Sequence, residues 1–154
     1  MSRRMKTAII ALALVAVVAT SGFSLGLGLA YGLDPIGGLA QDVMLSAKFD
    51  EFPALLGIGF RLADPVRVGL TADWWMATGN LVGFINYYAG PGLYAGVGAG
   101  LFDIGLRIPI GLNAYPIPEL ELFLEVAPTI GYNSATGDFP DPGAQGAIGF
   151  RFWF

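Results

Sequence analysis

The sequence predicts an all-β chain: an eight-stranded antiparallel up-and-down transmembrane β-barrel that follows an N-terminal signal peptide. Three observations predict it. Hydrophobic residues make up 55% of the 154 residues and charged residues only 13%, well below the ~25% of a soluble domain. Large apolar residues alternate with small or polar ones over most of the chain, which is typical of strands with two different faces. Turn-forming residues recur at intervals of about 10–15 residues.

The first residues predict a secretory signal peptide. Basic residues lie within 1–6, an uninterrupted run of apolar and small residues covers 7–20, and small residues end the run, so we expect cleavage after Ser21. A membrane-anchoring helix is the alternative, but it needs about 20 apolar residues, and the glycines that begin at Gly22 stop the run. We therefore expect residues 1–21 to be removed and the mature protein to leave the cytoplasm.

The mature chain, residues 22–154, is expected to form one barrel domain. In residues 23–31 every odd position is large and apolar, and every even position is Ser, Gly or Ala. Pro91 falls inside the fifth predicted strand and indicates a bulge or a break there. A turn is predicted at 78–80, and the only long loop at 133–143. The predicted strands cover 23–33, 39–50, 54–62, 66–76, 82–97, 102–114, 119–132 and 144–154.

The two faces of the predicted strands decide the class of barrel. A soluble lipocalin-like barrel would point its apolar residues inward and its charges outward. In 102–114 and 119–132 the polar face consists of glycines, small residues and a few opposite charges, which suits a crowded interior. The apolar face is continuous enough to contact lipid. Because only helices and closed barrels satisfy every backbone group in a bilayer, and no helix of useful length fits, the sequence predicts a closed barrel with its apolar face outside.

Strand length and aromatic residues agree with a membrane span. About 11 residues per strand, at ~3.3 Å each and tilted by ~45°, cover the ~25 Å apolar band of an outer-membrane barrel. An even number of strands places both termini at one end, which is taken as periplasmic. Aromatic residues on the apolar face fall at the ends of strands, as interfacial girdles require. The periplasmic group is Phe23, Phe49, Trp74, Phe152 and Phe154, and the outer group is Tyr31, Phe60 and Tyr132.

The C-terminus carries the most specific motif, an alternation of apolar residues that ends on phenylalanine. Its members are Ile148, Phe150, Phe152 and Phe154. This motif resembles the terminal strand of bacterial outer-membrane proteins, in which it is read as an insertion signal. The mature chain resembles the transmembrane domain of the OmpA class, and 102–115, 119–132 and 146–154 are similar to small outer-membrane proteins of spirochaetes. The resemblance implies a porin-like protein of the bacterial outer membrane, with outer-membrane lipid around it and the barrel-insertion machinery as a partner.

Charges on the inward face predict a row of ion pairs in the lumen. A tight connection at 114–118 would place Arg107 opposite Glu125, and pairing across the last loop would place Glu125 opposite Arg151. Glu121 lies close enough to take part in the same ion pairs. A shift of register by a few residues could put Glu121 in the place of Glu125. Such charges would be costly facing lipid, whereas inside they replace lost water with charge-assisted hydrogen bonds.

Composition excludes most catalytic chemistry. The chain has neither cysteine nor histidine, which removes disulfides, thiolate chemistry, the usual general base and the commonest metal ligand. We therefore expect no enzyme activity, no cofactor and no metal. Glu121 and Glu125 could in principle act as acid and base, but carboxylates that face arginines in an interior are better explained as ion pairs. The net charge of −4 argues against nucleic acid as a partner.

Two functions of different classes remain. The first is a non-catalytic barrel with a structural or adapter role in the outer membrane and a largely plugged lumen, because eight strands enclose just enough space for side chains to fill. The alternative is a narrow channel or conduit for small or hydrophobic solutes, which the many lumenal glycines would favour. A role in adhesion is less favoured, because only residues 133–143 form a predicted loop long enough to present a surface.

Overall fold

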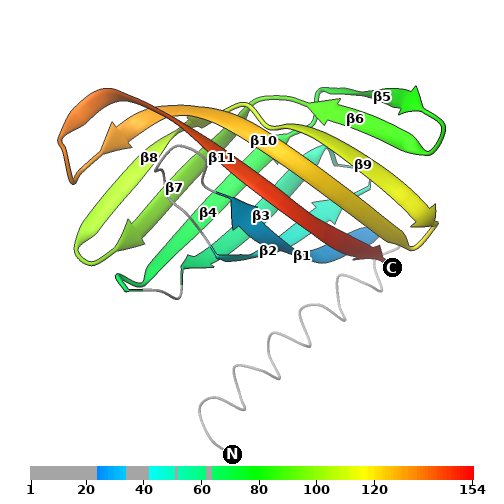
Figure 1. The fold of residues 1–154 in the computed structure, drawn as a ribbon, viewed down its shortest axis with the longest axis horizontal. Helices are drawn as coiled ribbons and strands as arrows, with labels where there is room; N and C mark the ends of the chain where they lie inside the picture. Colours follow the sequence, from blue (N-terminus) through cyan, green and yellow to red (C-terminus); the bar gives the residue numbers. More distant parts are fainter. Residues whose placement is uncertain (1–23, 34–41, 51, 62–63) are drawn as a thin grey trace, which may run out of the picture.

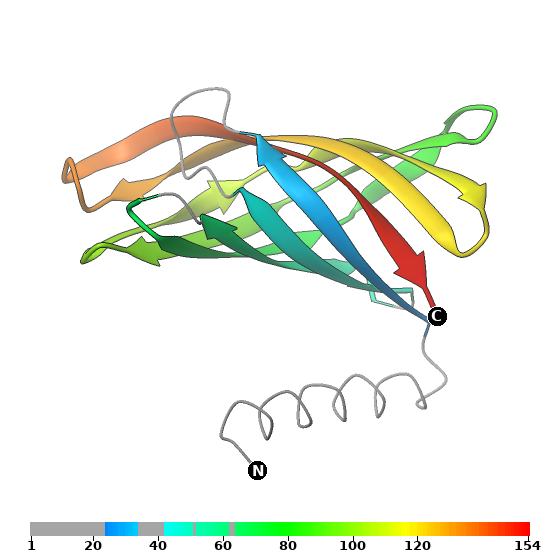
Figure 2. The same ribbon diagram turned by 60° about the horizontal axis from the view of Figure 1, so that its bottom comes forward.

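The computed structural model describes residues 24–33, 42–50, 52–61 and 64–154. Every regular element in these ranges is a β-strand, and the strands close into an antiparallel barrel (Figures 1 and 2). No helix in this part of the chain is long and apolar enough to cross a membrane. The predicted signal peptide, residues 1–21, lies outside the described residues.

Eleven strand segments build the barrel wall. Neighbouring segments follow the order β11-β1-β2-β3-β4-β7-β8-β10, and β10 pairs with β11 to close the ring. β9, β6 and β5 extend the wall at the end where the C-terminus lies, which we call the terminal end (Figure 1). The segments are β1 Leu25–Leu33, β2 Val43–Phe49, β3 Ala54–Arg61, β4 Arg67–Trp74, β5 Ala77–Val82, β6 Ile85–Ala89, β7 Gly92–Gly98, β8 Leu101–Arg107, β9 Ile110–Ile117, β10 Leu120–Asn133 and β11 Asp138–Trp153.

The segments amount to eight strands, because β4 continues into β5, β6 into β7, and β8 into β9. Pro91 and Pro109 interrupt the last two, since proline has no backbone N–H to donate to the ladder. β4 and β5 are separated by a bulge: between Asp73 and Ala77 the chain advances by four residues while its partner advances by three. The predicted eight-stranded antiparallel barrel is thus confirmed, and so is the break at Pro91.

The fourth strand is longer than predicted. Residues 78–80, expected to form a turn, belong to β5 and pair with β6. The chain reverses instead at Gly83, whose φ of 57° lies in the left-handed region that glycine tolerates best. The side chain of Asn80 stabilises this reversal by donating from Nδ2 to the carbonyl oxygen of Gly83 at 2.8 Å. The polar residues that predicted a turn therefore lie next to one rather than in it.

The long loop predicted at 133–143 is wrong. β10 ends at Asn133, β11 begins at Asp138, and the hairpin between them includes Gly137 at φ 74°. The first part of β11 contains two prolines, which suggested a loop. Prolines are tolerated there because β1 pairs with β11 only from Gly146 onward, so no strand among the described residues lies along the other edge of that segment. The predicted loop that could have presented a surface for adhesion is therefore a tight hairpin.

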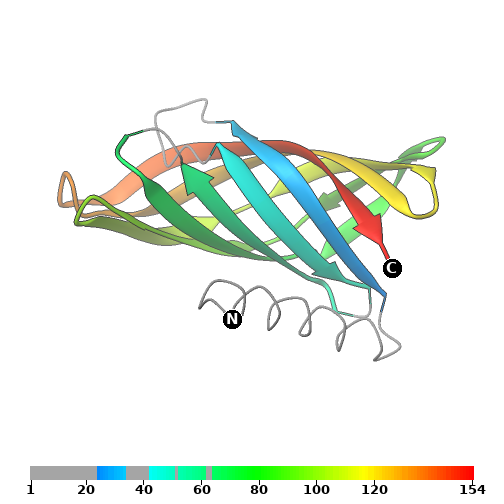
Figure 3. The ribbon, with the colours of Figure 1, turned by 90° about the horizontal axis from the view of Figure 1, so that it is seen from below.

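The barrel is polar inside and apolar outside. On β8, Leu106 is 58% exposed and the adjacent Arg107 only 5%. On β10 the same alternation exposes Leu122 and Leu124 and buries Glu121. Charged side chains of the described strands point inward or lie at strand ends. The strands that form the wall are tilted (Figure 3). Successive side chains point to opposite faces of each strand, so every second side chain points toward the lumen.

Most of the predicted aromatic residues lie on the outward face. Tyr31, Trp74, Phe152 and Phe154 are exposed, and Phe49, Phe60 and Tyr132 are half-buried. Phe23 lies outside the described residues.

Candidate functional site

The candidate site is the lumen, because the buried polar side chains of the barrel gather there. Most of the charged ones meet an opposite charge, as burial of ionised groups requires. The buried polar residues are Ser46, Lys48, Thr71, Asp73, Asp103, Arg107, Asn113, Glu121, Glu125 and Arg151.

Arg107 is the centre of the first cluster. Its Nη2 donates to Glu125 Oε1, and its Nε lies 3.2 Å from Asp73 Oδ1. Its Nη1 donates to the side-chain oxygen of Gln145 at 2.9 Å. The second oxygen of Glu125 accepts a hydrogen bond from the Tyr88 hydroxyl at 2.9 Å. One guanidinium therefore serves two buried carboxylates and links β4, β8, β10 and β11 across the lumen.

Glycines opposite these side chains give them room. A Cβ at Gly111 would clash with the Tyr88 ring, and a Cβ at Gly92 would clash with the Asp73 carboxylate. Gly111 pairs with Glu125 between β9 and β10, so the Tyr88 hydroxyl occupies the space over the glycine and reaches the carboxylate. At these positions neighbouring side chains occupy the space above the lumenal glycines, so the glycines do not open a passage.

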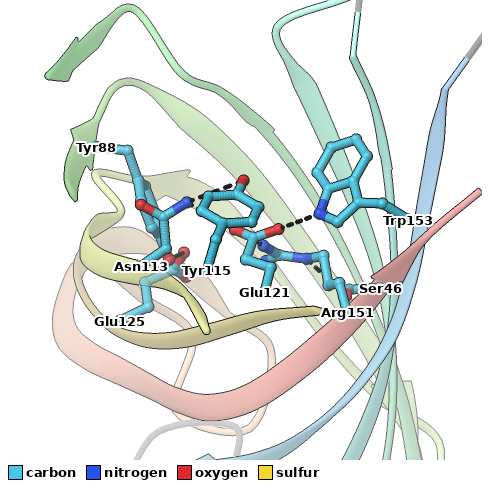
Figure 4. A network of polar contacts seen from close by, with 8 residues as sticks. All are labelled: Ser46, Tyr88, Asn113, Tyr115, Glu121, Glu125, Arg151 and Trp153. Carbon is cyan, nitrogen blue, oxygen red and sulfur yellow. Dashed lines mark hydrogen bonds and ion pairs between the residues drawn. The ribbon is translucent and has the colours of Figure 1, made fainter. Parts of the chain in front are cut away.

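Arg151 and Glu121 form the second cluster, nearer the terminal end (Figure 4). Arg151 Nη1 donates to Glu121 Oε1 at 2.7 Å, and both side chains are 0% exposed. Arg151 Nε donates to Ser46 Oγ at 3.0 Å. Glu121 also accepts from Asn113 Nδ2 at 2.8 Å and from Trp153 Nε1 at 3.0 Å. The carboxylate is held by three donors, which is the satisfaction a buried charge needs.

Aromatic rings surround the second cluster. The Arg151 guanidinium carbon lies 3.9 Å from the ring centre of Phe123 and 5.5 Å from that of Trp75. Trp75 stacks on Tyr88 with ring centres 3.7 Å apart. Lys48 Nζ lies 4.7 Å from the ring centre of Trp75. The two clusters are therefore joined through the stacked pair of rings.

The structure places the four predicted lumenal residues in the interior, but their register differs from the prediction. Arg107 lies opposite Thr129 and reaches Glu125 along the lumen rather than straight across the ladder. Arg151 lies opposite Glu121 and not Glu125. The reason is that the last hairpin is tighter than the predicted loop, which shifts the pairing of β10 with β11. The connection between β9 and β10 likewise turns later than predicted.

Several members of the clusters were not anticipated. Asp73, on β4, pairs with Gly92 on β7, which in turn pairs with Arg107 on β8, and Lys48 lies on β2. The sequence held one usable signal: Asp73 is the only charged residue between Arg67 and Asp103. An isolated charge in an apolar strand must find a partner inside.

The predicted insertion signal lies on the last strand, which pairs with β10 on one side and β1 on the other. Its residues face outward and are exposed, and Phe150 and Phe152 make an edge-to-face contact at 5.9 Å. The members are Ile148, Phe150, Phe152 and Phe154. β11 closes the ring, and the role of these side chains as an insertion signal remains a prediction.

A small cavity adjoins the first cluster. It measures about 30 Å³, more than the ~10–15 Å³ that a cavity needs to hold one water, and Met44, Thr71, Arg107 and Gln145 contribute to its lining. In the described part of the chain, no group of three or more acidic side chains is placed to hold a metal ion.

No protein-family model, curated protein or solved structure matches the chain.

Proposed function

We propose that this protein is a non-catalytic β-barrel of the bacterial outer membrane, with a structural or adapter role and a plugged lumen. One observation carries the proposal: the closed barrel is inverted relative to a soluble one, with apolar side chains outside and ion pairs inside.

The outward face supports a lipid environment. In water, a continuous apolar surface over all eight strands would far exceed the few hundred Å² that soluble monomers expose. In lipid the same surface is favourable, and closure of the ring leaves no unpaired strand edge in its midsection. The predicted signal peptide and the outward phenylalanines of β11 support export and insertion into the outer membrane.

The lumen supports a structural role better than a conduit. Arg107 bridges Asp73 and Glu125, and Arg151 binds Glu121, so two successive levels of the interior are crossed by ion pairs. The cavity beside Arg107 measures about 30 Å³, which is space for a few waters. A solute would have to break buried ion pairs to pass, and each such break is costly.

Fractionation and conductance together test the proposal. We expect the protein in the outer-membrane fraction, migrating faster on gels when unheated because the barrel stays folded. In planar bilayers the purified barrel should give no resolved single-channel conductance. Recovery from the soluble periplasm would contradict the membrane location. Steady conductance would contradict the plugged lumen and favour a channel.

A further inference from the structure

The wall of the barrel has strands of unequal length. β2 contains only 7 residues. Three places further along the ring, β6 and β7 form one strand that runs from Ile85 to Gly98. At ~3.3 Å per residue and a tilt of ~45°, β2 spans about 16 Å of a bilayer and the longer strand about 30 Å. The apolar band of an outer-membrane barrel is ~25 Å, so β2 is shorter than this band and the other strand is longer.

Acidic residues limit β2 at both ends. Asp42 precedes Val43 and Asp50 follows Phe49, each in a bend outside the strand, and Asp50 is exposed. A carboxylate is costly in hydrocarbon, and the short aspartate side chain cannot reach far toward water as lysine and arginine can. The bilayer boundary beside β2 therefore has to lie near both ends of this strand.

The longer strand has no such limits. The sequence contains no charged residue between Asp73 and Asp103. Large outward side chains occur along the whole strand, because Tyr87, Leu93 and Val97 are all exposed. This side of the wall can therefore face hydrocarbon over the full apolar band.

We propose that the barrel thins the surrounding lipid bilayer on one side, beside β2, and leaves it at ordinary thickness beside β6 and β7. Tilting the barrel cannot remove the mismatch, because tilt moves both ends of β2 in the same direction and does not lengthen its apolar stretch. A bilayer accommodates a short apolar span by becoming locally thinner. The inference rests on the proposed membrane location and adds which face of the wall deforms the lipid.

Fluorophores at the two ends of β2 test the thinning. The chain contains no cysteine, so one introduced cysteine carries a polarity-sensitive fluorophore at a single place. Val43→Cys and Phe49→Cys label the two ends of β2, and Leu93→Cys is the control on the longer strand. Each variant is folded into phosphatidylcholine vesicles of increasing acyl-chain length, and folding is checked by gel mobility without heating. If Phe49→Cys does not fold, Ala47→Cys, the preceding outward position, replaces it.

We expect both end labels to keep the red-shifted emission of the headgroup region in every lipid, while the Leu93 label stays blue-shifted. A blue shift of either end label as the acyl chains lengthen would show that the bilayer does not follow β2, and would overturn the inference but not the membrane location. Red-shifted emission from all three labels in every lipid would contradict the lipid-facing wall itself.

Discussion

Replacing Arg107 by methionine is the sharpest perturbation of the lumenal network. The side chains of Arg107, Glu125 and Asp73 are 5%, 3% and 1% exposed, so water cannot replace the lost guanidinium without opening the barrel. Methionine keeps much of the volume and removes the charge. Because one cation serves both carboxylates, the substitution leaves two buried negative charges unpaired.

The magnitude follows from this arrangement. Removing one partner of a buried ion pair typically costs about 3–5 kcal/mol, and two orphaned carboxylates put Arg107→Met at the upper end of that range. Glu125→Gln should cost less, because Arg107 keeps its contact with Asp73 and Tyr88 can still donate to the amide oxygen. The double variant Arg107→Met/Glu125→Gln should recover part of the loss.

Urea unfolding of the refolded barrel in lipid vesicles, followed by gel mobility and tryptophan fluorescence, measures these changes. Arg61→Met is the matched control, because that arginine lies at the end of β3 and takes part in none of the ion pairs formed by the described residues. A double-mutant cycle without coupling between Arg107 and Glu125 would refute the network. So would an Arg107→Met variant as stable as the control.

Three further predictions address the wall and its closure. Deleting Phe154 should reduce the amount of heat-modifiable barrel in cells much more than Phe139→Ala, which changes an exposed residue near the last hairpin; equal effects would remove Phe154 from any insertion signal. Leu106→Arg should lower the free energy of unfolding in vesicles by about 2–4 kcal/mol if that face lies in lipid, whereas Ala135→Arg, at an exposed position of the last hairpin, should change it little. Gly111→Ala should cost about 1–3 kcal/mol in the same assay, because its Cβ would displace the Tyr88 ring from Glu125, and an unchanged stability would show that the lumen is looser there.

The strand count and the two faces could be predicted from sequence because alternation is a local property. Successive side chains of a strand point to opposite faces, so the opposite faces of Leu106 and Arg107 can be predicted without knowing which strands lie beside them. Pro91 could be read in the same way, since its missing N–H acts at its own position.

Register could not be predicted as well, because it depends on where each hairpin reverses. Asn80 stabilises a turn that begins after it, and the prolines of β11 lie in a segment that β1 does not reach in the described part of the chain. Both cases led to a misplaced turn, and the second moved Arg151 from Glu125 to Glu121. A shift in register changes the partner of a side chain but not its face when the shift is even, which is why the lumenal residues were found and their pairing was not.

Contacts across the lumen were beyond the sequence for a different reason. Asp73 meets Arg107 from β4, and Ser46 meets Arg151 from β2, in each case across an intervening strand. The first pair depends on the registers of β4 with β7 and of β7 with β8 together, and the second depends on the pairing of β1 with β11; no local pattern encodes either.

Trp74 and Trp75 allow the most direct test of the inverted barrel, because they are adjacent in sequence and point to opposite sides of the wall, at 37% and 8% exposed. Two single-tryptophan variants, with the other tryptophans replaced by phenylalanine, would be folded into vesicles of lipids with brominated or ordinary acyl chains. Bromine in the acyl chains should strongly quench Trp74 and leave Trp75 nearly unchanged. Equal quenching of the two residues, or none of Trp74, would contradict a barrel with its apolar face in lipid and its charged face in a closed lumen.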